Sequence, residues 1–88
     1  MTSRPRDTAV HLTMYGRTGC HLCDDMSEAL EDCRDEVDFT LEFRDIDANP
    51  DWRQRYGERI PVLLVGDNEI CHYYLDRAAL MEHFRDGP

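Results

Sequence analysis

The spacing of apolar residues changes along the chain, and each spacing predicts a different element. Apolar residues stand at every second position from Val10 to Met14, which indicates a strand over roughly 9–15 that packs on one face. After a turn with two glycines at 16–19, apolar residues recur at intervals of three and four. That spacing is typical of an amphipathic helix, which we expect over about 21–34. The chain therefore begins with a strand, a glycine turn and a helix.

The remainder of the chain shows the same kinds of signal in a second series of elements. Alternation and an unbroken apolar run indicate strands, and an asparagine followed by proline indicates a helix start. In order, we expect a strand over 37–44, a short helix from Asn49-Pro50 to Gly57, a strand over 60–65, a turn over 66–68, a strand near 69–72, and a last helix capped by Asp76 with Leu80 and Phe84 on one side. The predicted order is β-α-β-α-β-β-α, which makes the chain an α/β protein.

Length and charge narrow the classes of protein that have this order of elements. Eighty-eight residues suit one small domain, which we place at 9–85 between flexible tails at 1–8 and 86–88. Acidic residues outnumber basic ones 19 to 10, and the formal charge of −9 repels the phosphates of nucleic acid. The longest apolar run is too short to cross a membrane, and the first residues have no apolar core for a signal peptide. We therefore expect a cytoplasmic monomer that binds neither nucleic acid nor membrane.

The four cysteines are too few for a disulfide scaffold, so their positions carry the information. Cys20 and Cys23 form a C-x-x-C pair at the junction between the first strand and the first helix. A thiol does disulfide chemistry as its thiolate, which the amide donors of a helix N-terminus stabilise. Cys20 is therefore the candidate attacking thiol and Cys23 the resolving thiol. Metal ligation and a purely structural pair are the alternative interpretations.

The charged residues around the pair act in opposite directions on the first thiol. Arg17 and any positive charge on His21 favour the thiolate. Asp24 and Asp25, which follow the motif directly, disfavour it. The sequence alone does not give the sign of their sum.

The other two cysteines stand in different surroundings. Cys33 belongs to the apolar side of the first helix, and we expect it in the core. Cys71 stands in the fourth predicted strand, and if that strand ends on the same side of the sheet as Cys20, Cys71 serves as an accessory thiol or is glutathionylated. Four aromatic residues are interpreted as packing residues of the core: Trp52, Tyr56, Tyr73 and Tyr74.

Two segments carry a resemblance to a known family. Y-G-R-T-G-C-H-L-C after a strand, and R-I-P-V-L-L-V at the start of another, resemble the glutaredoxin branch of the thioredoxin fold, over about residues 9–85. The chain is especially similar to small bacterial glutaredoxin-like proteins of uncharacterised substrate. This likeness implies a four-stranded mixed sheet in which the first two strands are parallel and the last two form an antiparallel hairpin. It also implies that the first and third helices cover one face and the second helix the other.

The resemblance further implies a set of substrate-binding residues. In that family the proline of the second motif is cis and faces the cysteine pair, so Pro61 takes this role and the backbone of Ile60 lies beside the substrate. Arg17 and Asp76 stand at the positions of the basic residue and the helix-capping acid that help to bind glutathione. From the residues alone, they are equally a solvated turn arginine and an ordinary helix cap.

Three departures from the family pattern concern the substrate and leave the fold untouched. His21-Leu22 replaces the usual Pro-Tyr between the cysteines, Arg59 replaces a threonine before Ile60-Pro61, and Cys71-His72 stands about where two glycines let glutathione lie close. Bulk at that last position is expected to narrow the groove. Glutathione therefore stays a hypothesis as co-substrate.

These observations lead to one expected function and two alternatives. We expect a dithiol thiol-disulfide oxidoreductase that reduces protein or glutathione mixed disulfides and receives electrons from glutathione or a reductase protein. It needs no bound metal or prosthetic group. The alternatives are a non-catalytic binding module with the same fold, and zinc or metal binding through Cys20 and Cys23, with His21 and His72 as further ligands.

Overall fold

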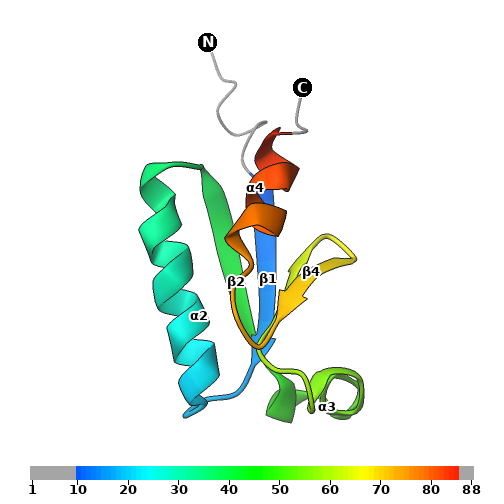
Figure 1. Ribbon diagram of the computed structural model, residues 1–88. Helices are drawn as coiled ribbons and strands as arrows, with labels where there is room; N and C mark the ends of the chain where they lie inside the picture. The colour runs from blue at the N-terminus through cyan, green and yellow to red at the C-terminus, as the bar shows by residue number, and fades with distance from the viewer. Residues whose placement is uncertain (1–9, 86–88) are drawn as a thin grey trace.

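The computed structural model of the chain describes residues 10–85, with side chains up to His83 (Figure 1). The expected tails at 1–8 and 86–88, and the expected packing of the Phe84 side chain, lie outside the described part. Within that part, no helix is long and apolar enough to cross a bilayer.

A four-stranded sheet with the order β2-β1-β3-β4 forms the centre of the domain. The pairing is mixed, as expected: β1 runs parallel to β2, and β3 is antiparallel to both β1 and β4. The bounds are β1 (Val10–Gly16), β2 (Phe39–Asp45), β3 (Val62–Val65) and β4 (Asn68–His72). The second strand starts later than the alternation predicts, because the backbone N–H of Val37 still donates to Cys33 O in the turn that ends the preceding helix.

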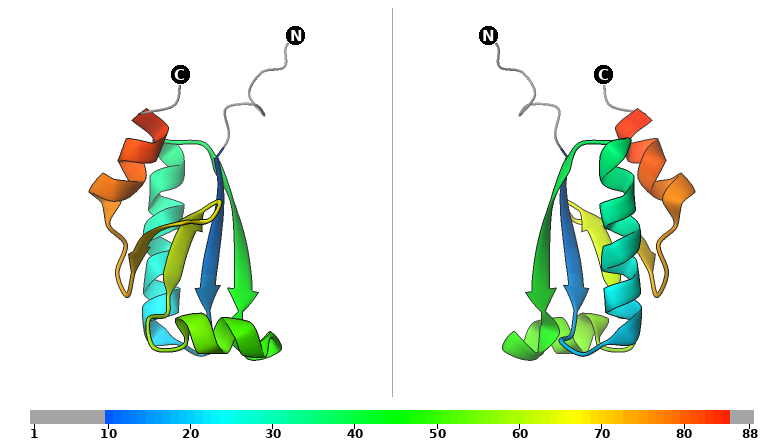
Figure 2. Two further views of the ribbon diagram at one scale, coloured as in Figure 1. Left: turned by 90° about the vertical axis from the view of Figure 1, so that its right-hand side faces the viewer. Right: turned by 90° about the vertical axis from the view of Figure 1, so that its left-hand side faces the viewer.

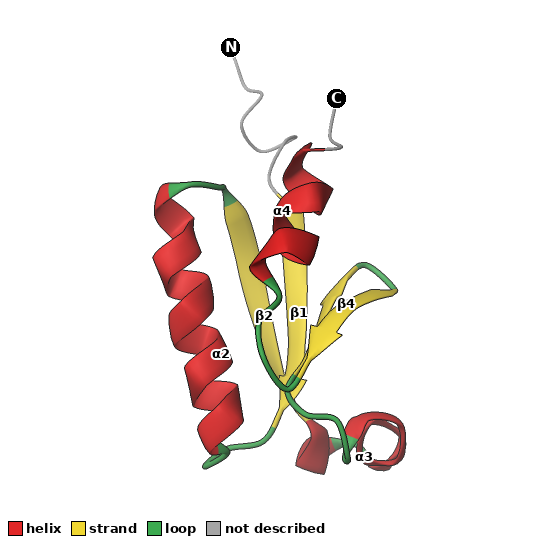
Figure 3. Ribbon diagram, in the orientation of Figure 1, coloured by secondary structure: helices red, strands yellow, loops and turns green. Residues whose placement is uncertain are grey.

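Three α-helices flank the sheet in the described residues: α2 (His21–Asp32), α3 (Pro50–Tyr56) and α4 (Arg77–Arg85). Figures 1 and 2 show α2 and α4 on one face of the sheet and α3 across the opposite side, at the end of the sheet where β1 and β2 finish. Two 3₁₀ turns follow α2 and β2, at Cys33–Asp35 and Ile46–Ala48. The element order and the division of helices between the faces are those expected (Figure 3).

Each face of the sheet packs its own hydrophobic core, because side chains alternate between the faces along a strand. Leu12 and Met14 of β1 pack with Met26, Leu30 and Leu80 of α2 and α4, and Cys33 is fully buried among them, as predicted. The two cores together provide the main stabilisation of the folded domain, because burial of apolar surface is the dominant favourable term in folding.

The second core is aromatic and holds α3 to the sheet. Tyr15 of β1 stacks on Tyr56 with 4.2 Å between ring centroids, and Trp52 meets Tyr15 edge-on at 5.4 Å. The interpretation of Trp52 and Tyr56 as packing residues is confirmed. The same interpretation is wrong for Tyr73 and Tyr74, which are 40% and 68% exposed in the connection that follows β4.

Candidate active site

Cys20 occupies the N-cap of α2, so its sulfur lies among the free amide donors of the first turn. Its backbone is extended, and the Cys23 backbone N–H donates to Cys20 Sγ at 3.3 Å. The helix begins because Cys20 O accepts the Asp24 N–H at 3.1 Å. Cys20 is partly exposed, whereas Cys23 is only 2% exposed. The pair is therefore asymmetric, with one sulfur open to a partner and one enclosed.

The connection before the pair depends on two glycines for different reasons. Gly19 has a φ of +83°, a conformation that favours glycine, and it turns the chain into the helix. Gly16 has an ordinary backbone but no room for a side chain: a Cβ there would lie 2.7 Å from Cys23 Sγ and 2.9 Å from Phe43 Cε1. The absent side chain of Gly16 therefore determines where the enclosed sulfur can lie.

Gly16→Ala is expected to displace the Cys23 sulfur and to lower the free energy of unfolding by about 1–3 kcal/mol, as overpacking does elsewhere. Urea denaturation measures this loss. In a Cys23→Ala background the cost of Gly16→Ala should fall, because the clashing sulfur is gone. Gly19→Ala is the matched control, since nothing lies within 4 Å of its Cβ and its strain cost should be the same in both backgrounds. An unchanged cost of Gly16→Ala in the Cys23→Ala background would contradict the assigned contact.

The environment of Cys23 keeps its thiol protonated. Burial raises the pKa of Cys23 to about 12, and the hydrogen bond and negative charge of Cys20 act in the same direction. Asp24 adds a smaller contribution of the same sign. At neutral pH Cys23 therefore carries its proton. Of the other acidic residues near the pair, Asp25 places its Oδ2 3.3 Å from His21 Nε2 on the exposed side of the helix.

Arg17, the expected anion-binding residue, is already paired within the chain. Its Nε and Nη2 donate to the two carboxylate oxygens of Asp47 at 3.0 and 3.2 Å, and these contacts raise the pKa of Arg17. Thr18 donates to Asp45 in the same region, at 3.3 Å. Asp45 and Asp47 are not among the residues predicted from the sequence, although the parallel pairing of the first two strands brings Asp45 opposite Gly16. Asp47 thus occupies one edge of the Arg17 guanidinium and offsets its charge, while the other N–H donors of this exposed side chain make no hydrogen bond within residues 10–85.

The Ile60–Pro61 bond is cis, as the resemblance implies, and Pro61 is buried. Tyr73 holds this loop from two sides. Its backbone N–H donates to Pro61 O at 2.9 Å, and its hydroxyl donates to Glu58 O at 2.8 Å. Tyr73 adopts a φ of +67°, which is uncommon for a residue with a side chain. The tyrosine was predicted only as a packing residue, and no sequence signal points to this bracing role.

Two of the departures from the family pattern turn out to be joined by a single carboxylate. Glu69 accepts from Arg59 Nη1 at 2.6 Å through one oxygen and from His72 Nδ1 at 2.8 Å through the other. Burial acts to raise the pKa of Glu69, but the hydrogen bonds from His72 and Arg59 hold it below its usual value. The loop before Pro61 and the end of β4 are therefore joined by a charged cluster of Arg59, Glu69 and His72.

Cys71 and Asp76 complete the predicted set. Cys71 is half-buried and packs against the core beneath α2 and α4, and burial raises the pKa of its thiol. This surrounding favours a packing role over an accessory thiol. Asp76 caps α4, where its Oδ1 accepts the Ala79 N–H at 3.1 Å.

The structure does not bring the residues of the zinc alternative together. Among residues 10–85, no three side chains of the histidine, cysteine, aspartate or glutamate type lie close enough to hold a metal ion. His72 is engaged with Glu69, and His21 lies near Asp25. A pair of thiols without further ligands is a poor zinc site, because structural zinc takes four.

Comparisons with known proteins agree with this architecture. The family described as Glutaredoxin-like domain (DUF836) matches residues 11–85. Protein Ne2328 of Nitrosomonas europaea has a similar solved structure, with a TM-score of 0.80, 36% identity, and coverage of 94% of this chain and 98% of that one. The glutaredoxin of E. coli has a TM-score of 0.56 at 27% identity, over 88% of this chain and 99% of that one.

The curated relatives agree with this family assignment, and their names state no activity. An uncharacterized protein of Mycobacterium tuberculosis is 30% identical over 83 residues, which cover 89% of this chain and 80% of the relative. The family match thus covers residues 11–85. These residues include the four-stranded sheet, the cis proline and the N-cap cysteine described above. This chain belongs to the glutaredoxin-like domain family and has the glutaredoxin type of the thioredoxin fold.

Proposed function

We propose that this protein is a dithiol thiol-disulfide oxidoreductase in which Cys20 attacks a disulfide and Cys23 resolves the product. The asymmetry of the pair is the observation that carries the proposal. Cys20 Sγ is accessible and accepts a helix N–H, while Cys23 is enclosed and keeps its proton. An accessible thiolate beside a protonated thiol is the arrangement that two successive exchange steps need.

The first step transfers the substrate to the protein. The Cys20 thiolate attacks one sulfur of the substrate disulfide, a bond forms between them, and the other substrate sulfur leaves as a thiolate that takes up a proton from solvent. The charge on Cys20 is lost in this step. Since that charge and its hydrogen bond contribute to the raised pKa of Cys23, their loss lets the pKa of Cys23 fall towards the value that burial alone sets.

The second step releases the reduced substrate. Cys23 attacks Cys20 Sγ and forms the Cys20–Cys23 bond, the bond between Cys20 and the substrate breaks, and the second substrate sulfur leaves as a thiolate that takes up the proton lost by Cys23. Two electrons have then moved from the dithiol to the substrate, and the protein holds a Cys20–Cys23 disulfide. Glutathione or a reductase protein returns it to the dithiol.

Protein disulfides are the substrate class that we propose, with glutathione as the weaker candidate. Arg17 is paired with Asp47, which offsets the positive charge that would attract a tripeptide carboxylate. Cys71-His72 stands about where the family has two glycines, and His72, which pairs with Val62 beside the cis-proline loop, is bonded to Glu69. An extended segment of a protein needs only backbone pairing at such a loop and makes fewer demands on these side chains.

The Cys23→Ser variant tests the order of attack. It should form a mixed disulfide with insulin, whose own disulfides are intact, or with glutathione disulfide, and be unable to resolve it, so that the adduct accumulates on Cys20. Mass spectrometry of the intact protein after quenching with acid measures the adduct. The matched control is Cys20→Ser, which keeps the same number of thiols and should trap nothing. Equal trapping by both variants would contradict the assigned roles, and no trapping together with no turnover by the wild type would favour a non-catalytic binding module.

A further inference from the structure

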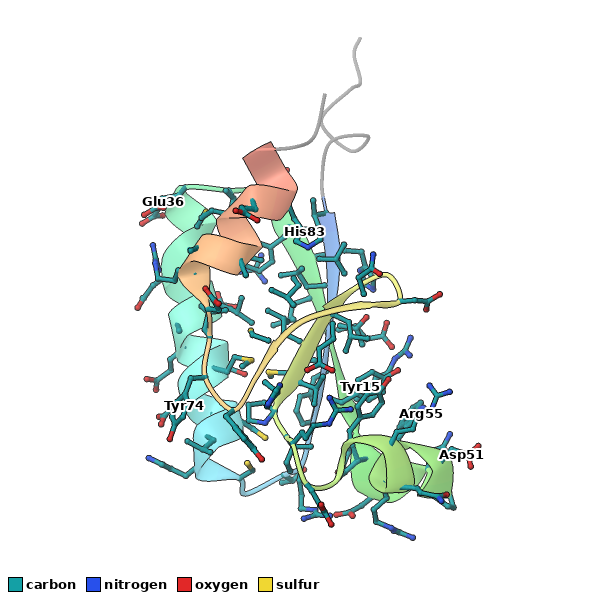
Figure 4. All side chains as sticks on the ribbon, turned by 45° about the vertical axis from the view of Figure 1, so that its right-hand side comes forward. Tyr15, Glu36, Asp51, Arg55, Tyr74 and His83 are labelled. Atoms are coloured by element: carbon teal, nitrogen blue, oxygen red, sulfur yellow. The ribbon has the colours of Figure 1, made fainter. Side chains whose placement is uncertain are left out.

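A second concave site lies on the face of the sheet that α3 covers only in part. It is a groove of about 600 Å³, within the range of about 300–1,000 Å³ that small-molecule sites occupy. Figure 4 shows Arg55 of α3 and Tyr15 of β1 on this side of the sheet. The lining comes from β1, β2, α3 and the β3–β4 hairpin, and it includes Thr13, Tyr15, Arg44, Arg55, Leu64 and Asp67. None of them belongs to the thiol site.

A buried hydroxyl without a partner lies at the floor of this groove. Thr13 stands in the central part of β1, between Glu42 of β2 and Leu64 of β3, and is 7% exposed. Among residues 10–85, no group forms a hydrogen bond with its Oγ1. An unpaired buried hydroxyl destabilises a protein, so such groups usually have a hydrogen-bond partner in the functioning protein.

Two further donors point to the chemistry of that partner. The guanidinium of Arg55 forms no ion pair or hydrogen bond within the described part of the chain. The Tyr15 hydroxyl accepts from Arg44 Nη1 at 2.8 Å and keeps its own hydrogen to donate. Arg44 itself is satisfied by Glu42, at 2.7 Å, and secures the position of the Tyr15 hydroxyl. The groove thus offers three unused donors, one of them a full positive charge, in a chain whose net charge is −9.

We propose that this groove binds a small organic anion, with a phosphate or carboxylate accepting from Arg55, Thr13 and Tyr15 and an uncharged body lying on Leu64. Acceptor-rich oxyanions match donors of this kind, and hydrogen bonds that involve a charge are the stronger ones. Asp67, at the edge of the groove, would repel a second negative charge, so the ligand carries its charge at one end. The site is independent of the proposed exchange reaction.

Probes of matched shape test the charged head and the uncharged body of this ligand separately. Phenyl phosphate and benzoate carry the two charged heads on a ring, inorganic phosphate carries a head alone, and benzyl alcohol carries a ring alone. In a titration followed by amide and arginine Nε resonances, one of the two ring anions should shift Thr13 and Arg55 at about 1–10 mM. Inorganic phosphate should bind more weakly, and benzyl alcohol should shift neither. No shift at these residues with either ring anion, or equal shifts with benzyl alcohol, would overturn the proposal.

Two variants test the donors directly. Arg55→Gln should weaken binding of the ring anion about tenfold or more, while Arg53→Gln, on the same helix and paired with Asp47 outside the groove, should leave it unchanged. Thr13→Val removes the hydroxyl with little change of shape. It should weaken binding several-fold and yet raise the melting temperature of the free protein, because the unpaired polar group is gone. A lowered melting temperature, or binding unchanged in Arg55→Gln, would show that the groove is not this site.

Discussion

Serine in place of Cys20 is expected to lower the rate of disulfide reduction by several orders of magnitude, because the hydroxyl cannot ionise near neutral pH and cannot form the mixed disulfide. The N-cap hydrogen bond should be retained in this variant, since a serine oxygen accepts the Cys23 N–H as readily as the sulfur does. Insulin reduction, coupled in turn to glutathione and to thioredoxin reductase, measures the rate and identifies the electron donor. Urea denaturation of the same variant should show a stability close to that of the wild type.

The matched control for this result is Cys71→Ser. Cys71 lies against the core and burial raises the pKa of its thiol, so we expect it to take no part in exchange. This variant should lose some stability, because a polar hydroxyl replaces a packed sulfur, while its rate per folded molecule should match that of the wild type. A rate lowered as far as in Cys20→Ser would instead make Cys71 an accessory thiol.

Raising the pH from about 9 to about 12 is expected to destabilise the wild type by up to about 1.4 kcal/mol per pH unit more than a Cys23→Ala variant. Burial is the main cause, since it raises the pKa of Cys23 from an ordinary value near 9 to about 12 in the folded chain. Within this interval the unfolded chain loses the Cys23 proton and the folded chain keeps it. The unfolded state then binds fewer protons, so the free energy of unfolding falls as the pH rises.

Urea unfolding followed by Trp52 fluorescence, at a series of alkaline pH values, provides this comparison. Below about pH 9 both states keep the proton, and the wild type and the variant should differ by a constant amount. Above it the two curves should converge. Curves that stay parallel up to about pH 12 would contradict the enclosed, protonated state of Cys23 and, with it, the proposed division of roles.

The elements of the fold were predictable because local patterns determine them. The three-and-four spacing through Met26 and Leu30 specifies which residues of α2 face a core, and the structure confirms it. The alternation correctly places Leu12 and Met14 in a core, but the prediction that the strand packs on one face is wrong, because Thr13 and Tyr15 are buried on the other face. Boundaries were less accurate for a physical reason. The 3₁₀ turn after α2 delays β2 to Phe39, and no propensity at Val37 announces that turn.

The residues of the candidate site also differ in whether local sequence predicts their contacts. The N-cap position of Cys20 and the capping role of Asp76 follow from local sequence, since a cap concerns only the next turn of its own helix. The pairing of Arg17 with Asp47 and the linking of Arg59 to His72 through Glu69 join residues that are far apart in the chain. Spacing along a sequence carries no information about such partners.

By itself, the sequence determined one small acidic α/β domain and the position of the C-x-x-C pair at a helix start, which makes Cys20 and Cys23 the candidate reactive residues. Only the tertiary structure decided how different those two thiols are. Packing against Gly16 encloses Cys23 and raises its pKa, and burial of this kind depends on the elements that surround a residue. The same holds for the groove around Thr13. Its donors converge from two strands and a helix, and only the folded chain brings them to one place.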